Sequence, residues 1–195
     1  MTSSCTAGSA LCFASSVARA LIIVDFQNDF TSGGALAVPD GDAIGPRVDE
    51  LARSGEFDFV VATRDWHPPD HKSFAAQGGP WPPHCVQGTP GAELHPSLDR
   101  ALVDAVVDAG YEPDLEGYSG FESTNLADLL REHDVDHVTL VGLATDYCVR
   151  HTALDALRHG FGATVDTTAV RAIDAEPGDG ERALEEVRAA GGSIA

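Results

Sequence analysis

The sequence predicts a three-layer α/β/α sandwich built around a mainly parallel central sheet. The first observation is the run ALIIVDF at residues 20–26, which is aliphatic without polar alternation, as central parallel strands covered on both faces are. The second is that apolar, β-branched runs alternate along the chain with segments of helical periodicity. Strands that alternate with helices of about ten residues indicate βαβ units, in which helices cover both faces of a parallel sheet.

The size and composition of the chain are those of one globular domain. Its 195 residues are 43% hydrophobic and 22% charged, which is enough to fill one core. The first 19 residues are small and polar and lack the basic start and apolar stretch of a secretory signal, so we expect a disordered extension. A single domain is therefore expected over residues 20–195.

The charge of the chain argues against two classes of partner. Its 12 basic and 31 acidic residues give a formal net charge of −19, whereas binding nucleic-acid phosphates requires positive charge. No apolar run approaches the ~18 residues of a membrane span, so we expect neither a nucleic-acid nor a membrane partner. Cys5, Cys12, Cys85 and Cys148 lack metal-finger spacing and are too sparse for a disulfide framework, which indicates the reducing cytoplasm.

Turn residues and the spacing of apolar residues divide the first half of the chain into predicted loops, a helix and a strand. Glycines and a proline at 33–41 mark a polar loop after the first strand, and apolar residues at helical spacing then predict a helix at 44–54. A second apolar run predicts a strand at 57–67. Closely spaced prolines and glycines make residues 68–96 a long loop, and loops of that length in a compact domain are usually functional.

The second half continues the alternation. The run at 138–143 is apolar and β-branched, and from Val149 the apolar positions take helical spacing, which predicts a strand followed by a helix. The remaining expected elements are a short helix at 98–107, a strand-poor stretch to residue 121, a helix at 125–133, a weak strand at 163–167 and an amphipathic helix at 180–190. In such a parallel sheet, ligands collect beyond the carboxyl ends of the strands, where Asp25, Asp65, His67 and Cys148 fall.

Cys148 lies on the predicted turn from strand to helix. The unpaired N–H groups and the positive dipole at a helix N-terminus favour a thiolate and can bind an oxyanion, so this is a suitable position for a nucleophile. The alternative is an inert buried cysteine, since free cysteines are among the most buried residues.

A second group combines a carboxylate with imidazoles. Alternation along the strand places Asp65 and His67 on one face, His71 can fold back from the loop, and His84 follows thirteen residues later. Such ligands suit one divalent ion, zinc, iron or manganese, with positions left for water. The alternative is a set of surface histidines in a polar loop.

Several motifs together resemble the nicotinamidases of the isochorismatase-like cysteine hydrolase superfamily. They are ALIIVDFQNDF, DWHPPDHKSF, WPPHC, EGYSGF and VGLATDYCVRHTALDALRHGF, in the family's order and near its spacing. The resemblance covers residue 20 to the C-terminus. It implies the isochorismatase-like hydrolase fold and hydrolysis of a small amide, the pyridine carboxamide nicotinamide, to nicotinate and ammonia through a thioester. It leaves open whether the chain forms a homo-oligomer.

The resemblance also implies roles for individual residues. Asp25 corresponds to the general base and Cys148 to the nucleophile. The implied metal ligands are Asp65, His67, His71 and His84. Phe30 and Trp81 correspond to the aromatic walls around the pyridine ring, with Tyr118 nearby. Leu143–Ala144 corresponds to a cis peptide, and the N–H groups of Ala144 and Cys148 to the oxyanion hole.

One position departs from the family pattern. Residues 108–121 align without a gap, and Ala109 stands where the family has a catalytic lysine. A cation there would lower the pKa of the thiol, and losing such a group costs on the order of 10²- to 10⁴-fold in rate. Lys72, the only lysine, is an alternative source of that charge. Asp166 is a second departure, in a strand that is normally apolar.

Three functions remain open from the sequence. The first is an active nicotinamidase-like amidohydrolase. The second is a diverged member that keeps the pocket and metal but acts on another small amide, or in another reaction, with Ala109 leaving room where the lysine stood. The third is a non-catalytic protein that retains the ring and metal sites.

Overall fold

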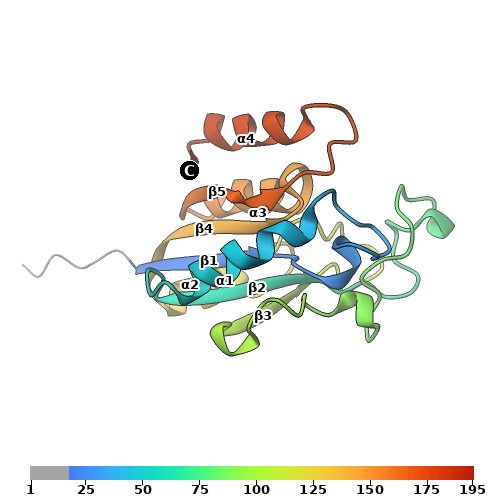
Figure 1. The fold of residues 1–195 in the computed structure, drawn as a ribbon, viewed down its shortest axis with the longest axis horizontal. Helices are drawn as coiled ribbons and strands as arrows, with labels where there is room; N and C mark the ends of the chain where they lie inside the picture. Colours follow the sequence, from blue (N-terminus) through green and yellow to red (C-terminus); the bar gives the residue numbers. More distant parts are fainter. Residues whose placement is uncertain (1–17) are drawn as a thin grey trace, which may run out of the picture.

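The computed structural model describes residues 18–195 (Figure 1). The first strand begins at Ala18, two residues before the expected start of the domain. Residues 1–17, which include most of the expected disordered extension with Cys5 and Cys12, lie outside the described residues. No helix in the described part of the chain is both long and apolar enough to span a membrane.

A six-stranded sheet forms the middle layer, and all of its neighbouring strands are parallel. This confirms the predicted fold class. The strand order is β3-β2-β1-β4-β5-β6. The strands are β1 (Ala18–Val24), β2 (Phe59–Asp65), β3 (Ala105–Ala109), β4 (Val135–Leu143), β5 (Gly162–Arg171) and β6 (Ser193–Ile194).

In the described part of the chain, four α-helices form the two outer layers. Val48 and Leu51 of α1 pack in one apolar cluster with alternate residues of β1, and the other three helices contribute to a second cluster on the opposite face. β1 is buried on both faces because it lies between these two clusters, as its unbroken aliphatic sequence predicts. The helices are α1 (Gly45–Arg53), α2 (Leu126–Glu132), α3 (Arg150–Arg158) and α4 (Asp179–Ala189).

The neighbouring strands β1 and β4 run in the centre of the sheet and approach closely at their carboxyl ends. Val24 pairs with Gly142, and a Cβ atom built on Gly142 would lie 2.0 Å from the carbonyl oxygen of Val24. Gly142 also has φ +115°, a conformation that side chains disfavour. Glycine is therefore required at this contact, which brings the ends of β1 and β4 together.

Two elements differ from the expectation. The predicted helix at 98–107 is wrong: only a single 3₁₀ turn at Arg100–Leu102 forms, and β3 begins at Ala105. The segment turns into an edge strand because Val61 to Asp65 of β2 are free to pair with it, and the Asp104 carboxylate accepts the Val60 N–H at 2.8 Å. The short strand β6 was also missed, because two residues are too few to show the alternation of apolar and polar residues that marks a strand.

The unusual Asp166 of β5 is explained by a partner from another layer. Its carboxylate accepts from Arg47 Nη2 of α1 at 3.2 Å and from the backbone N–H of Thr168 at 2.9 Å. The pKa of Asp166 is lowered: burial alone would raise it, but these hydrogen bonds favour the ionised form. The charge is a structural ion pair between α1 and the sheet.

Candidate active site

Three chemically active side chains meet beyond the carboxyl ends of three neighbouring strands. Asp25 follows β1, Asp65 ends β2 and Cys148 follows β4. All three are buried, and one ligand atom of each lies within 4.8 Å of the others. Residues that are 123 positions apart in the sequence are thus placed in one cluster by the parallel sheet.

Asp25 is held in a restricted conformation. Its φ of +46° is in the left-handed region, and its carboxylate Oδ1 accepts from Thr63 Oγ1 of β2 at 2.7 Å. Burial, and then the nearby Asp65 carboxylate, raise the pKa of Asp25 to about 8. Asp25 can therefore both hold and release a proton near neutral pH.

Cys148 lies within the π-helical turn η6 (Thr145–Val149), which continues into α3. Burial, and then the Asp25 carboxylate, raise the pKa of its thiol well above the ordinary value; the Asp25 carboxylate lies within 4.8 Å of the sulfur. The expected lowering of this pKa by a helix N-terminus is thus outweighed. An unassisted thiolate is disfavoured, so activation of the thiol requires transfer of its proton to a base.

The turn before Cys148 begins with a cis peptide bond between Leu143 and Ala144. β4 ends at Leu143, and the Ala144 carbonyl accepts the N–H groups of Tyr147 (3.1 Å) and Val149 (3.1 Å). This compact turn brings Ala144 and Cys148 to the same side of the cluster, where both line the pocket described below.

The candidate metal ligands point their Nε2 atoms toward one carboxylate. His67 Nε2 lies 3.3 Å and His84 Nε2 3.9 Å from Asp65 Oδ2. The Nδ1 atoms of these histidines lie within hydrogen-bond distance of the backbone carbonyls of Gly110 (3.0 Å) and Pro82 (2.8 Å). Donation from Nδ1 to a carbonyl orients the ring and leaves Nε2 free for a metal.

His71 is the fourth predicted ligand and lies beside this group, whose ligand atoms within 4.8 Å of one another come from Asp65, His67 and His84. Its ring stacks on that of His67 with 3.9 Å between centroids, and its Nδ1 is 2.8 Å from Ser73 Oγ. His71 Nε2 and Asp65 Oδ1 are both buried without a hydrogen-bond partner. Burial, and then the charge of His67, lower the pKa of His71 to about 4, so its ring is neutral at pH 7. Buried neutral imidazoles and unpartnered ligand atoms fit a divalent metal ion.

Gly110 supports this arrangement. It has φ +58°, and a Cβ atom built on it would lie 2.5 Å from the ring of His67. No side chain larger than hydrogen fits there without displacing the imidazole. The glycine thus allows its own carbonyl to accept from His67.

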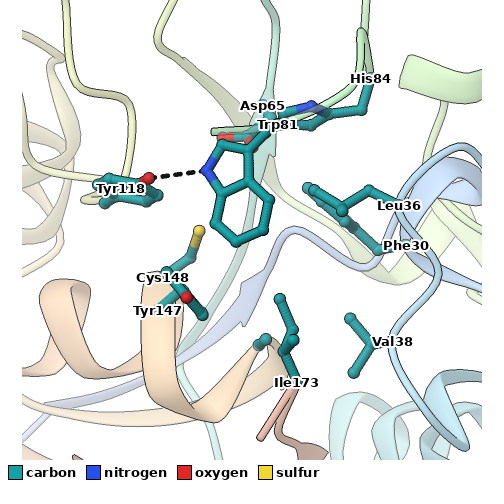
Figure 2. A pocket seen from close by; sticks show the side chains of 11 residues that line it. Phe30, Leu36, Val38, Asp65, Trp81, His84, Tyr118, Tyr147, Cys148 and Ile173 are labelled. Atoms are coloured by element: carbon teal, nitrogen blue, oxygen red, sulfur yellow. Dashed lines mark hydrogen bonds and ion pairs between the residues drawn. The ribbon is translucent and has the colours of Figure 1, made fainter. Parts of the chain in front are cut away.

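An apolar pocket opens beside the cluster (Figure 2). The sulfur of Cys148 points into it, and Trp81 closes one side by donating from Nε1 to the Tyr118 hydroxyl at 2.8 Å. Phe30 lies across the pocket from Tyr118. The lining residues are Phe30, Leu36, Val38, Asp65, Trp81, His84, Tyr118, Ala144, Tyr147, Cys148 and Ile173.

Four of these lining residues were missed in the sequence. Tyr147 immediately precedes Cys148, and that adjacency was the one available signal. Leu36 and Val38 come from the polar loop after β1, while Ile173 follows β5; no motif marks them. Ile173 reaches the pocket because its N–H donates to the Asp146 carboxylate in η6 at 3.0 Å, a contact formed only in the folded chain.

The structure places Ala109, buried, at the end of β3 opposite Asp65. Lys72 does not supply the missing cation: its Nζ pairs with Glu116 at 2.6 Å, on the partly exposed loops. Among the described residues, no lysine or arginine is hydrogen-bonded or ion-paired to Asp25. The charges that act on Asp25 are that of Asp65, which raises its pKa, and that of His67, which lowers it.

Comparison with known proteins gives a consistent result. The chain matches the Isochorismatase domain family over residues 19–195. It is 48% identical to the nicotinamidase/pyrazinamidase of Mycobacterium tuberculosis, covering 88% of this chain and 95% of that one. It is 42% identical to the nicotinamidase of Escherichia coli, covering 90% and 93%. The crystal structure of the Pyrococcus horikoshii pyrazinamidase in complex with zinc superposes with a TM-score of 0.84 at 52% identity, covering 91% and 98%.

Proposed function

Because this chain belongs to the isochorismatase-domain family, we propose that it hydrolyses nicotinamide to nicotinate and ammonia through a thioester on Cys148. Its relatives at 42% and 48% identity are nicotinamidases. The single observation that carries the proposal is the buried Asp25–Cys148 pair, with carboxylate oxygen and sulfur within 4.8 Å of each other, beside an apolar pocket. A pair of this kind can attack a carboxamide that is held against it.

The pocket suits a flat aromatic amide. Phe30 and Trp81 offer aromatic faces, and Tyr118 lies across the pocket from Phe30. Asp65, His67, His71 and His84 would hold one divalent ion, with zinc favoured by the imidazole-rich donor set. When bound, that ion would accept the ring nitrogen of the substrate or polarise a water molecule.

The residues of this chain can carry the proton through both half-reactions. Asp25 accepts the thiol proton while the Cys148 sulfur bonds to the amide carbon, and the N–H groups of Ala144 and Cys148 face the developing oxyanion. Asp25 then gives the proton to the amide nitrogen, the C–N bond breaks and ammonia leaves. Water next attacks the thioester, its proton passes to Asp25, and the C–S bond breaks to release nicotinate and restore the thiol.

We expect the alanine at position 109 to lower the rate of hydrolysis without changing the order of its chemical steps. Since no lysine or arginine of the described residues is paired with Asp25, its ionised form is unfavourable, which agrees with its pKa of about 8. We therefore expect slow turnover at neutral pH. The runner-up function, hydrolysis of a different small amide by a diverged pocket, is supported only by this substitution.

The test is ammonia release by purified, zinc-loaded protein from a panel of amides, namely nicotinamide, pyrazinamide, benzamide and an aliphatic amide. We expect turnover of nicotinamide and pyrazinamide, whose rings contain nitrogen, none after Cys148→Ala, and retention of activity after Cys85→Ala, since Cys85 is the other free cysteine among the described residues. Turnover of nicotinamide by Cys148→Ala would contradict the thioester. Turnover confined to another amide would favour the diverged function.

A further inference from the structure

We propose that Gln27 is a positioning residue that sets where the Asp65 carboxylate lies between the metal ligands and Cys148. Gln27 is completely buried, three residues beyond the end of β1. Its Nε2 donates to the carbonyl oxygens of Asp65 (2.8 Å) and Ala92 (2.9 Å), and its Oε1 accepts the Asp65 N–H (2.8 Å). The side-chain amide therefore satisfies both backbone polar groups of Asp65 on this side.

The strand geometry explains why Asp65 needs such a partner. β1 and β2 stay in register only to the pair Ile23–Ala62, because the chain turns away after Val24. Asp65 lies three residues farther along β2, where no β1 backbone remains to pair with it. Its N–H and C=O on that edge would be buried and unpaired, which is costly. The Gln27 amide takes the place of the missing strand.

Asp65 is the residue whose position affects most of the site. Its carboxylate is the one member shared by two clusters, the first with His67 and His84 and the second with Asp25 and Cys148. A shift of its backbone would move the metal ligands relative to the nucleophile. Gln27 also donates its own N–H to the Asp25 carbonyl at 2.8 Å, so one short segment ties the proposed base to Asp65.

The inference rests on the metal-binding role that the proposed function gives to Asp65. Outer hydrogen-bond partners of metal ligands typically contribute 10- to 100-fold in metal affinity or activity. Replacing Gln27 with methionine keeps its length and removes all three hydrogen bonds. We therefore expect Gln27→Met to weaken zinc binding by about 10-fold or more and to lower kcat.

The experiment measures zinc affinity by chelator competition, apart from any turnover assay, and unfolding by urea for every variant. Gln87→Met is the matched control, because Gln87 Nε2 also donates to two backbone carbonyls, of Trp66 (2.8 Å) and Tyr111 (3.1 Å), but to no proposed ligand. We expect Gln87→Met to lose stability while binding zinc as the unchanged chain does. If Gln27→Met fails to fold, Gln27→Glu takes its place. This variant keeps an acceptor for the Asp65 N–H but loses the donors, so we expect it to weaken zinc binding and lower kcat by smaller factors.

Two results would overturn the role of Gln27. One is a folded Gln27 variant that binds zinc as tightly as the unchanged chain, and the other is an equal loss of affinity in Gln87→Met. Zinc binding by the unchanged chain tests the metal site of the proposed function separately. The difference between variants tests Gln27, so the two failures are distinguishable.

Discussion

The raised pKa of Asp25 makes the fold less stable but suits the residue for proton transfer. It is buried beside Asp65, and both effects raise its pKa to about 8. A buried carboxyl group that is protonated in the folded chain, but ionised in the unfolded chain above pH 4, makes folding less favourable as the pH rises. The chain retains this group at a site where proton transfer is needed, as is common for functional carboxylates.

Asp25→Asn is therefore expected to stabilise the fold while abolishing hydrolysis. The folded state binds more protons than the unfolded state between pH 4 and about 8, so the wild-type chain loses stability across that window and the asparagine variant does not. The advantage of the variant should grow by on the order of 3–4 kcal/mol between pH 5 and pH 8 in urea unfolding. Asp136→Asn, at an exposed position of β4, is the control and should show no such growth.

The second prediction at the residue scale concerns Ala109. The reactive form of the Asp25–Cys148 pair has lost one proton, so kcat/KM on nicotinamide should rise as the pH passes through about 8. Ala109→Lys places a cation at the end of β3, opposite Asp65, where it should favour ionised Asp25. We expect faster turnover and a rise in activity at lower pH.

Ala109→Met separates charge from volume in this experiment, because methionine matches much of the lysine chain without its charge. If both variants have the same pH profile as the parent, the cation does not act on the pair. The pocket would then have diverged at more than this one residue.

At the scale of elements, the site depends on how β1 and β4 end. Asp25 follows the last residue of β1, and the turn with Ala144 and Cys148 follows β4. The close contact of Gly142 with the Val24 carbonyl holds these two ends together. The distance between base and nucleophile is thus set by strand packing and not by flexible loops.

Gly142→Ala should destabilise the fold and lower kcat. Its Cβ would have to displace the Val24 carbonyl, and Val24 adjoins Asp25. Gly160→Ala is the matched control, since Gly160 also has positive φ (+90°) but nothing within 4 Å of a built Cβ. We expect Gly160→Ala to cost about 1–2 kcal/mol of strain without loss of activity, and Gly142→Ala to cost more. Equal effects of the two on stability and kcat would show that the strand contact is unimportant.

For the whole molecule, the strand order explains the position of the site. From β1 the chain winds through β2 and β3 to one edge of the sheet, and then from β4 through β5 and β6 to the other. The direction of winding reverses between β1 and β4, and ligands in such sheets bind outside the carboxyl ends at this reversal. Asp25 and Cys148 flank that point, with the pocket beside them.

The fold class and the family could be predicted because they depend on local sequence patterns. The aliphatic run of β1 and the alternation of strands and helices predicted the parallel sandwich, and the motifs around Asp25, His67 and Cys148 predicted the family. β3 was missed because its edge position, and not its five residues, makes it a strand. The role of Asp166 was missed because its partner Arg47 is 119 positions away.

The sequence by itself determined the residue types of the proposed site and the fold class, because these depend on local periodicity and on motifs. Only the tertiary structure decided that the thiol pKa of Cys148 is raised and not lowered, that Ile173 forms part of the apolar wall of the pocket, and that the Gln27 side chain pairs with the backbone of Asp65. Burial, and contacts between residues far apart in the chain, set these properties, and neither exists until the chain has folded.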